Sequence, residues 1–572
     1  MIFRVASLCL ALFCSQSALA EADYSLILVG GGLKSCSSTA LDGCVAGTQA
    51  PANSLRQQEF QVTPDALVHL QQLSVSADQR QQLQALLQFL QARMGQQRLS
   101  ERALLQALRA AEVEVAGQWM SGREIWQGLS TEHKDAVLDL LQTPMLVNQQ
   151  RLIEQAMPLS LQNKHTLAIY QEIVAQARKV NNRDTPKIVV MTASSRDPFA
   201  AVDYYRSLFN SLGAETSWLP ISKTYQSMQN QGLTACDSFA LQLATEQQTY
   251  QRADIYPDLF SYTQTMCRDG RNFALQLLAD ADAVFFNGGD QSLTYLAFKQ
   301  PDGTDSPELA AIRAKFLANK LVIAGTSAGT AVQTGSPHAM ITGGDSLGAF
   351  AAPAFLAPLW SCQPACPGES TLSAQPTSGF GFFPYGILDT HFSERGRQGR
   401  LLQLLAQTSG SLGVGIDENT ALLVKPHAKG AQFRVMGEAG VFFAEATDSA
   451  SKWRTHYLTH DDKATLQGKG RTQELQFQLA AWKYTNSSRK QMLMQTHDVF
   501  DGSRYRALAS LMCANQNSKA TGLFEVNGQS WQLVMERSAR TTSRQGALQI
   551  QNQMLAVCSY HDLLVSYQEQ HE

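Results

Sequence analysis

A serine flanked by glycines follows directly after a short apolar run. Gly325-Thr326-Ser327-Ala328-Gly329 fits the pattern G-x-S-x-G, and Leu321 to Ala324 before it is typical of a buried strand. On a sharp strand-to-helix turn, small neighbours permit the strained backbone that exposes a serine hydroxyl. Backbone N–H groups at the start of the next helix, that of Ala328 first, can stabilise an oxyanion. Ser327 is therefore a candidate nucleophile, and a purely structural turn is the alternative.

A second glycine motif ends another apolar run. Asn287-Gly288-Gly289-Asp290-Gln291 follows Ala283 to Phe286 in the same manner. Paired glycines let the backbone approach a ligand closely, so the N–H of Gly289 is a candidate for the second oxyanion donor. An ordinary turn is the competing interpretation.

A serine nucleophile needs a base, usually histidine, and a carboxylate that orients the base. His391 follows the apolar end of Ile387 to Thr390, where we expect it to open a helix. His338 is nearer to Ser327 in sequence, but no strand precedes its loop. The residues alone leave the orienting acid open among Asp345, Asp389, Asp417 and Glu418.

Three arginines follow His391. Arg397 and Arg400 are three residues apart and would share a helix face, with Arg395 just before them. Arginine forks suit carboxylates, so the cluster indicates an acidic substrate. The alternative is a solvated face whose arginines pair with Glu394 and other acids.

Strands and helices alternate around these residues, which predicts an α/β domain with a mainly parallel, three-layer sheet covered on both faces. Ligand sites in such folds lie beyond the carboxyl ends of the strands, where both glycine motifs fall. The expected strands are residues 24–29, 187–191, 283–286 and 321–324, and the expected helices are 203–212 and 307–318.

The rest of the chain divides by pattern. Leucines at helical spacing (Leu83, Leu86, Leu87 and Leu90, then Leu104, Leu105 and Leu108) predict several short packed helices. Beyond Gly415 short β segments follow, and Asn527-Gly528 between two β segments indicates a hairpin in a small, separate β-rich module. The expected parts are a signal peptide (1–20), the first strand of the catalytic domain (21–49), a helical insertion (50–180), the catalytic domain (181–450) and a β-rich C-terminal extension (451–572).

Composition narrows the class of protein. The chain of 572 residues is 44% hydrophobic and 17% charged, with a net charge of −3. A basic nucleic-acid surface or a polybasic membrane anchor is therefore not expected. Arg4, the apolar run Val5 to Cys14 and Ala18-Leu19-Ala20 predict a signal peptide, and the run is too short to span a bilayer. A buried N-terminal helix or a lipoprotein signal at Cys14 is the alternative. We expect a secreted or periplasmic protein.

The number of cysteines also indicates an exported protein. Removal of residues 1–20 leaves an even number of cysteines, which in an exported chain indicates disulfides. They fall into four local pairs along the sequence, although eight cysteines allow 105 connectivities. Zinc binding by Cys362 and Cys366 is the rival, and no matching second pair supports it. The cysteines are Cys36, Cys44, Cys236, Cys267, Cys362, Cys366, Cys513 and Cys558.

Together, the order and spacing of these motifs resemble the cyanophycinase and peptidase E family of serine peptidases, and most closely its cyanophycinase branch. The resemblance covers residues 24–33 and about 187–445, so about half of the chain. The matching segments are Asn287 to Gln291, Gly325 to Gly329, Asp389 to Arg400 and Gly413 to Ala421.

The resemblance implies a class I glutamine-amidotransferase-like fold. It also implies hydrolysis of cyanophycin, an aspartate polymer with arginine on each β-carboxyl, to β-Asp-Arg dipeptides. Ser327 and His391 fall on the family's nucleophile and base, and Glu418 on its third catalytic residue. Thr390 stands where an amide side chain is expected, which weakens one substrate contact. The family's substrate-contacting positions correspond to Gln291, Asp389, Arg395, Arg397 and Arg400.

No metal or organic cofactor is expected, since Ser, His and oxyanion donors suffice for acyl transfer. Cyanophycinases are often dimers, so a homodimer is possible. The competing functions are a β-aspartyl or Asp-X dipeptidase of the same fold and a non-catalytic polymer-binding protein. A lipase or esterase would have the order Ser, acid, His, whereas Glu418 follows His391 here.

Overall fold

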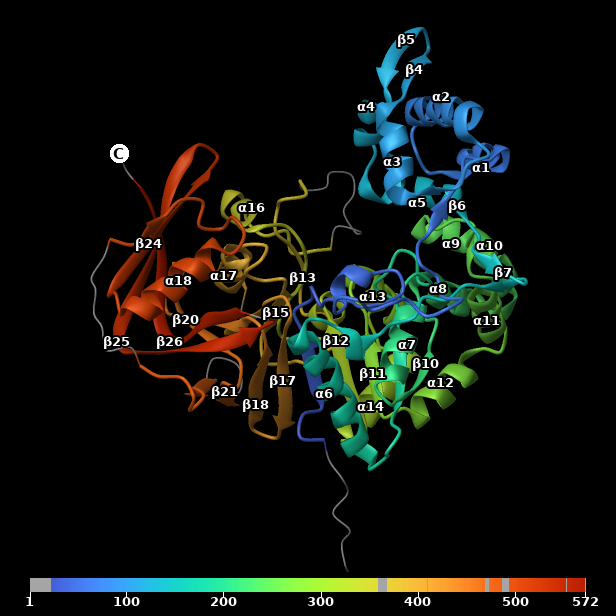
Figure 1. Ribbon diagram of the computed structural model, residues 1–572. Helices are drawn as coiled ribbons and strands as arrows, with labels where there is room; N and C mark the ends of the chain where they lie inside the picture. The colour runs from blue at the N-terminus through green and yellow to red at the C-terminus, as the bar shows by residue number, and fades with distance from the viewer. Residues whose placement is uncertain are drawn as a thin grey trace, which may run out of the picture.

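The computed structural model describes most of the chain. In Figure 1 a small body of helices stands on one side of a large α/β body, and a β-rich body lies beside the latter. The expected signal peptide and the pair Cys362 and Cys366 lie outside the described residues. The described residues are 22–358, 368–408, 410–449, 451–468, 473–485, 493–551 and 553–570.

The α/β body is built on a mixed sheet. Among the described residues this sheet has nine strands, in the order β10-β9-β11-β12-β1-β17-β18-β21-β22. The neighbours from β10 to β1 pair in parallel, and β17 runs antiparallel to β1. A large sheet that contains parallel strands confirms the predicted α/β class. The strands are β10 (Glu215–Trp218), β9 (Lys187–Met191), β11 (Ala283–Phe286), β12 (Val322–Thr326), β1 (Leu26–Val29), β17 (Thr420–His427), β18 (Gly430–Gly437), β21 (Lys463–Gln467) and β22 (Glu474–Gln478).

Helices cover both faces of the parallel part of the sheet. Leu26 and Leu28 of β1 pack into one core, and Ile27 and Val29 pack into another on the opposite face. Strands buried on both faces have continuous apolar sequences, which is why these strands are recognisable in the sequence. The first core contains α8 (Lys223–Gln231), α9 (Phe239–Gln247), α11 (Pro257–Arg268), α12 (Arg271–Asp280), α13 (Gln291–Phe298) and α14 (Pro307–Leu317), and the second contains α6 (Lys164–Asn181) and α7 (Val202–Ser211).

The helical body is smaller than the range 50–180. Its core is formed by residues between Phe60 and Leu141, joined by Tyr250. Helix α6 lies within the expected range but packs against the main sheet, because its apolar face meets β1, β9 and β12. The elements of the helical body are β2 (Glu59–Phe60), α1 (Pro64–His69), α2 (Ala77–Met94), β3 (Leu99–Ser100), α3 (Glu101–Ala110), β4 (Glu112–Val115), β5 (Gln118–Ser121), α4 (Gly122–Gln127), α5 (Thr131–Leu141) and β6 (Gln142–Thr143).

The C-terminal residues complete a second sheet instead of forming a separate module. Among the described residues it has eight strands, in the order β15-β16-β19-β20-β26-β25-β24-β23. The expected hairpin at Asn527-Gly528 joins β24 to β25. The bounds are β15 (Ile387–Thr390), β16 (Leu412–Ile416), β19 (Gly440–Ala446), β20 (Lys452–Thr459), β26 (Gln553–Glu569), β25 (Gln529–Ile550), β24 (Lys519–Val526) and β23 (Gln495–Thr496); the helices packed near it are α16 (Ser346–Ala351), α17 (Gln398–Gln407) and α18 (Arg504–Asn515).

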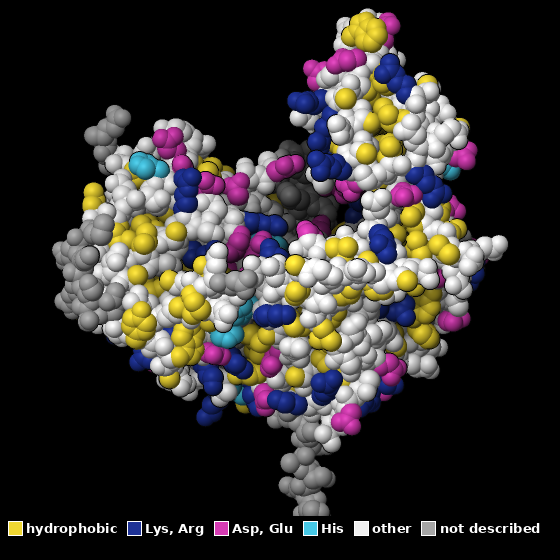
Figure 2. All heavy atoms as spheres, viewed as in Figure 1, with side chains coloured by type: hydrophobic (Ala, Val, Ile, Leu, Met, Phe, Trp, Pro, Cys, Tyr) yellow, Lys and Arg dark blue, Asp and Glu magenta, His cyan; other side chains and the backbone are white. Residues whose placement is uncertain are grey.

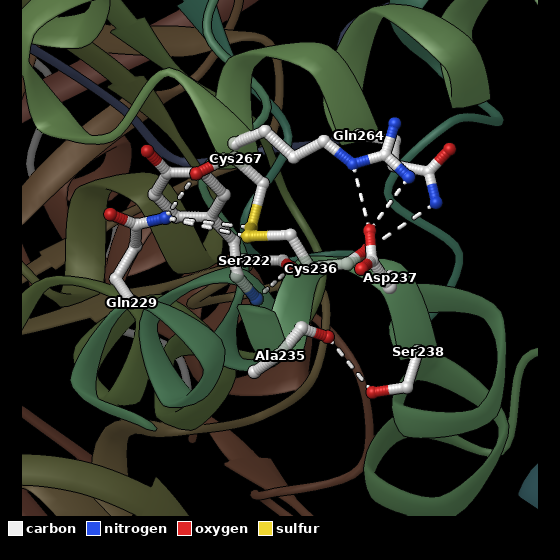
Figure 3. Close-up of a disulfide and its surroundings, with 10 residues drawn as sticks. Ser222, Gln229, Ala235, Cys236, Asp237, Ser238, Gln264 and Cys267 are labelled. Carbon is white, nitrogen blue, oxygen red and sulfur yellow. Dashed lines mark hydrogen bonds and ion pairs between the residues drawn. A yellow bond between two sulfur atoms is a disulfide. The ribbon is translucent and has the colours of Figure 1, made fainter. Parts of the chain in front are cut away.

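Disulfides join the described cysteines as neighbours along the sequence. The pairs are Cys36–Cys44, Cys236–Cys267 and Cys513–Cys558. Figure 3 shows Cys236–Cys267 with the amide of Gln229, which donates to the Cys267 carbonyl at 2.8 Å. Disulfides are typical of proteins that fold outside the reducing cytosol. Within the described stretches, each helix is too short or too polar to traverse a bilayer.

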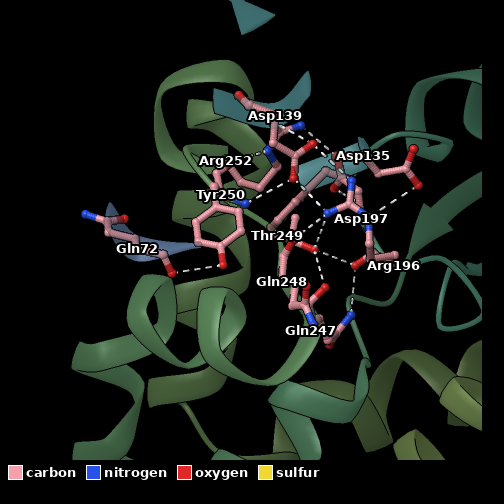
Figure 4. A network of polar contacts seen from close by, with 11 residues as sticks. Gln72, Asp135, Asp139, Arg196, Asp197, Gln247, Gln248, Thr249, Tyr250 and Arg252 are labelled. Atoms are coloured by element: carbon pink, nitrogen blue, oxygen red, sulfur yellow. Dashed lines mark hydrogen bonds and ion pairs between the residues drawn. The ribbon is translucent and has the colours of Figure 1, made fainter. Parts of the chain in front are cut away.

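A network of buried charges fastens the helical body to the α/β body (Figure 4). Asp139 of α5 accepts from Arg196 at 2.8 and 3.1 Å, and from the Tyr250 N–H at 3.1 Å. Arg252 lies 3.4 Å from Asp139 and donates to Asp197 at 2.7 Å. Arg196 and Asp197 belong to the loop after β9. The helical body therefore meets the α/β body at the carboxyl end of β9, the second strand of the sheet.

Substitution Asp139→Ala should loosen this attachment. Its carboxylate is 7% exposed, so its removal leaves two largely buried guanidinium groups short of counter-charge. Breaking a buried pair in this way costs about 3–5 kcal/mol. Native-state hydrogen exchange should show the opening free energy of residues 59–143 falling by that amount.

Asp135→Ala is the matched control. Asp135 lies on the same helix and faces the same Arg196, at 3.7 Å, but it is 48% exposed. An exposed pair contributes about 0–1 kcal/mol. Equal losses in the two variants would show that the network does not fasten the helical body.

Candidate active site

Ser327 lies on a strained turn at the carboxyl end of β12. Its φ of +53° is unusual for a residue with a side chain, and α15 (Ala328–Ala331) begins directly after it. The Ser327 N–H donates to the Val29 carbonyl at 3.0 Å, and the Thr330 hydroxyl donates to the same carbonyl. The turn is thus held by the end of β1, with the serine hydroxyl partly exposed.

His391 lies at the carboxyl end of β15, with its Nε2 2.8 Å from the Ser327 Oγ. It has a φ of +48° and donates its N–H to the Gly30 carbonyl at 2.8 Å. The expected helix does not begin here: residues 391–397 form turns and α17 begins at Gln398. The left-handed backbone of His391 interrupts the path from strand to helix. The alternative base, His338, is buried with its N–H bonded to Gly335.

Glu418 completes a chain of hydrogen bonds, since its Oε1 lies 2.6 Å from the His391 Nδ1. The other acids have different partners. Asp345 caps α16 by accepting from the Gly348 N–H, and Asp389 pairs with Arg400. Asp417 accepts from the Ser393 N–H and the Tyr457 hydroxyl. The structure therefore brings Glu418, and none of these other acids, to His391.

The glycines after β1 make room for these side chains. A Cβ on Gly31 would lie 2.4 Å from the His391 Nε2, and one on Gly32 would lie 2.4 Å from the Glu418 Oε2. Both glycines have positive φ, +99° and +61°. In the sequence Gly30-Gly31-Gly32 indicates only a tight turn, and its role in admitting two functional side chains is visible only in the structure.

Burial controls the charge of His391. Desolvation lowers the pKa of His391 below its usual 6.5, and the cations Arg395 and Arg397 act in the same direction, while Glu418 opposes them. The side chain is 12% exposed. His391 is thus kept neutral, with its Nε2 free to accept a proton from the Ser327 hydroxyl.

Free N–H groups lie beside Ser327. A Cβ on Gly288 would be 3.2 Å from the Ser327 Cβ, so the loop after β11 lies against the serine. Within the described residues, neither Gly289 nor Ala328 donates its N–H to a protein acceptor. Ser194 holds this loop in place. Its hydroxyl donates to the Asn287 carbonyl, and its carbonyl accepts from the Asp290 N–H. These donors can receive a negative oxygen formed at the serine.

The arginine cluster lines a cavity of about 210 Å³ that reaches Ser327 and His391. Arg400 is buried and donates to both Asp389 oxygens, and Arg397 donates to the Thr390 carbonyl at 2.6 Å. Burial favours the neutral acid, yet Arg400 and Arg397 lower the pKa of Asp389. Arg400 is the N3 residue of α17 and Arg397 is its N-cap, so the expected shared helix face is not formed.

The arginines Arg395, Arg397 and Arg400 outnumber the acids Asp290 and Asp389 in the lining of this cavity. Asp290 accepts from the Ser292 N–H and forms no ion pair among the described residues. Asp389 is shared by Arg400 and Arg397, while no described acid pairs with Arg395. Burial, with Arg400 beside it, lowers the pKa of Arg397 to about 9, so the guanidinium stays charged at neutral pH without a full counter-charge. Gln291 also lines the cavity and donates to the Ile341 carbonyl. An incoming carboxylate is the partner that the cavity lacks.

Curated proteins similar to this chain are cyanophycinases. That of Trichormus variabilis is 30% identical over 171 residues, which are 30% of this chain and 47% of the relative. That of Geminocystis herdmanii is 32% identical over 196 residues, which are 32% of this chain and 61% of the relative. Over these segments the chain is similar to cyanophycinases. It spans about half the length of the curated relatives it matches.

No family model matches the chain. A solved peptidase from an acI-B1 Actinobacterium is 18% identical, with a TM-score of 0.32, and the match covers 52% of this chain and 90% of the peptidase.

In this cyanophycinase-like chain, the C-terminal helix α18 reaches the site through Arg506. Its guanidinium donates to Glu394 at 2.6 Å and to Asp417 at 2.8 Å. Glu394 in turn accepts from the Glu418 N–H at 3.0 Å. The sequence gives no signal for this contact, because 88 residues separate Arg506 from Glu418 and arginine is common on helix surfaces.

Arg506→Ala should destabilise the protein strongly. The Asp417 carboxylate is fully buried, and the loss of Arg506 removes its only described counter-charge. We expect the free energy of unfolding, measured in urea, to fall by about 3–5 kcal/mol. Arg504→Ala, two positions before Arg506 on the same helix, removes only exposed pairs with Asp498 and Asp501 and should cost less than about 1 kcal/mol. Similar losses in both variants would contradict this role of Arg506.

Proposed function

We propose that this chain is a serine peptidase that hydrolyses cyanophycin to β-Asp-Arg dipeptides. In this proposal Ser327 is the nucleophile, His391 is the general base and Glu418 orients the base. The observation that carries it is the continuous relay from the Ser327 Oγ through His391 to Glu418, with spacings of 2.8 and 2.6 Å. Such distances suit proton transfer from a serine to a histidine that a carboxylate orients.

Each step of acyl transfer has a group to perform it. The Ser327 hydroxyl attacks the scissile carbonyl while its proton passes to the His391 Nε2. The N–H groups of Gly289 and Ala328 receive the oxyanion of the tetrahedral intermediate. His391 then returns the proton to the leaving amine, and the acyl-enzyme is hydrolysed by water with His391 again as base. Glu418 holds the imidazole with the proton on Nδ1 and stabilises the imidazolium.

The proposed substrate agrees with the arginine cavity. In cyanophycin each arginine is linked through its α-amino group, so it keeps a free α-carboxylate and a free guanidinium. The net positive charge at Arg395 and Arg397 supports binding of such a carboxylate next to Ser327. Asp389 forms an ion pair with Arg400, so in this proposal these two residues hold Arg397 in place. The groups that contact the substrate are Arg395, Arg397 and Gln291.

The finer fold assignment and the location belong to the same proposal. The parallel strands with helices on both faces, and a site at their carboxyl ends, support a class I glutamine-amidotransferase-like catalytic domain. Residues 1–20, with their signal-peptide pattern, and the disulfides of the described residues support export to the periplasm or the medium.

Incubation of the purified protein with cyanophycin tests the activity. Mass spectrometry should detect β-Asp-Arg dipeptides, whereas a β-aspartyl or Asp-X dipeptidase would leave the polymer intact and cleave only short peptides. In Ser327→Ala the rate should fall by more than about a thousandfold, because oxyanion binding alone leaves only a small residual rate. Its melting temperature should not decrease, since alanine keeps the backbone bond to Val29. If Ser327→Ala keeps a rate above this residual level, the nucleophile is another side chain.

The activity should depend on pH through His391. Because the base must be neutral and its pKa lies below 6.5, kcat/KM for a neutral ester should be high above that pKa. This activity should be lost as the pH falls through the pKa of His391. Arg395→Gln removes a cation that lowers the pKa, so the midpoint should move to higher pH. The distant, exposed Arg540→Gln should leave the midpoint where it is. An acid limb centred above 6.5 in the unmodified protein would contradict this prediction.

A further inference from the structure

A neighbouring cavity of about 630 Å³ opens on Ser327 and is not used by the carboxylate contacts described above. It shares Gly289, Ser327, His391 and Arg395 with the arginine cavity. Its other wall comes from the segment after β1, from Glu154 and from Tyr204. An amide bond attacked at Ser327 has an acyl side and an amine side. If one side occupies the arginine cavity, the other side must enter this one.

Glu154 gives this cavity a negative charge. Its Oε1 accepts from the Ser37 hydroxyl at 2.5 Å and from the Thr39 hydroxyl at 2.6 Å. No lysine, arginine or histidine in the described part of the chain forms an ion pair with Glu154, and its Oε2 has no hydrogen-bond donor there. A half-buried carboxylate that is held rigidly and lacks a cation is arranged to receive one.

The carboxylate is held in place by covalent and backbone contacts. Ser37 and Thr39 lie inside the loop closed by Cys36–Cys44. The same loop pairs with the chain around Glu154, because the Ser38 N–H donates to the Gln155 carbonyl at 2.9 Å and the Met157 N–H to the Cys36 carbonyl at 2.7 Å. The position of Glu154 is therefore fixed before any ligand binds, which lowers the entropic cost of binding.

The shape of the cavity favours a flat cation. Tyr204 and Tyr205 both line it, with their ring centroids 5.2 Å apart and their planes 76° apart. A guanidinium can lie on an aromatic face while its edge donates to a carboxylate, whereas an ammonium cannot do both as well. Arg395 lies in the same cavity and can receive a carboxylate carried by the same ligand.

We propose that this cavity is the subsite for the arginyl group on the far side of the scissile bond, with Glu154 pairing with its guanidinium. The inference rests on the proposed function and extends it. An aspartate polymer without arginine would fill the arginine cavity but leave Glu154 unpaired. Glu154 thus makes the chain specific for an arginine-bearing polymer, in addition to the selection of carboxylates by Arg395 and Arg397.

The test uses synthetic tetramers of β-Asp-Arg in which one unit at a time carries citrulline, the neutral isostere of arginine. Mass spectrometry identifies the cleaved bond and the unit on each side of it. For the unmodified protein, citrulline in one flanking unit should lower kcat/KM by about tenfold to a hundredfold, the value of one charge-assisted contact. The measured ratio is kcat/KM with arginine divided by kcat/KM with citrulline at the same unit. In Glu154→Gln this ratio should fall to about one at that unit and remain unchanged at the other flanking unit. The ratio is measured within each variant, so a general loss of activity does not affect it.

Glu114→Gln is the matched control, since it removes the same charge from an exposed position on β4 in the helical body. It should keep the full ratio. The inference is overturned if the unmodified protein does not distinguish citrulline from arginine at either flanking unit, or if Glu154→Gln keeps the distinction.

Failure of the proposed function is a different result, in which no tetramer is cleaved. Calorimetry then measures how tightly Ser327→Ala binds the arginine and citrulline tetramers. This measurement tests whether the cavity binds the arginyl group, independently of cleavage. Tighter binding of the arginine form that disappears when Glu154→Gln is added supports the subsite. Equal binding of both forms overturns it.

Discussion

Three successive carbonyl groups at the end of β1 hold the segments that form the site. The Val29 carbonyl accepts from the Ser327 N–H, the Gly30 carbonyl from the His391 N–H and the Gly31 carbonyl from the Asn419 N–H, next to Glu418. These segments come from distant parts of the sequence and from both sheets. Ser327, His391 and Asn419 all have positive φ, a conformation that persists only when the surrounding structure fixes it. The end of β1 supplies that constraint, and its glycines leave the space into which the side chains project.

The parts outside the central sheet are attached to the same region. Asp139 of the helical body pairs with Arg196, and the neighbouring Ser195 hydroxyl accepts from the Asn287 side chain at 2.7 Å, in the loop that lies against Ser327. On the opposite side Arg506 of α18 pairs with Asp417 and Glu394 behind Glu418. Both attachments are charged and at least partly buried, so each depends on its partner being present. The helical body and the C-terminal strands are therefore parts of the framework around the site.

The central sheet and the relay of hydrogen-bonded side chains could be predicted because each has a local signal. Buried parallel strands have continuous apolar sequences, and Ser327, His391 and Glu418 each follow such a strand. Other features depend on contacts between distant residues. The arginines after His391 have helical spacing, yet the left-handed backbone at His391 delays α17 to Gln398. Strand β25 is polar over much of its length, and only the turn at Asn527-Gly528 that joins it to β24 has a clear pattern. Glu154 and Arg506 are ordinary charged residues in sequence, and only the tertiary structure brings them to the site.

The position of β1 in the sequence has a consequence for the order of folding. Its residues 26–29 pair with residues 323–326 on one side and 421–424 on the other. Closing loops of this length is entropically costly, and both neighbours must exist before the strand can be inserted between them. During synthesis, the helical body can fold early on its own core, while β1 has its first neighbour only after residue 326 and its second only after residue 424 has been made. The carbonyls that hold the site are thus among the last groups to reach their partners. A nascent or truncated chain would carry Ser327 without the base beside it, and would be unable to cleave peptides before folding is complete.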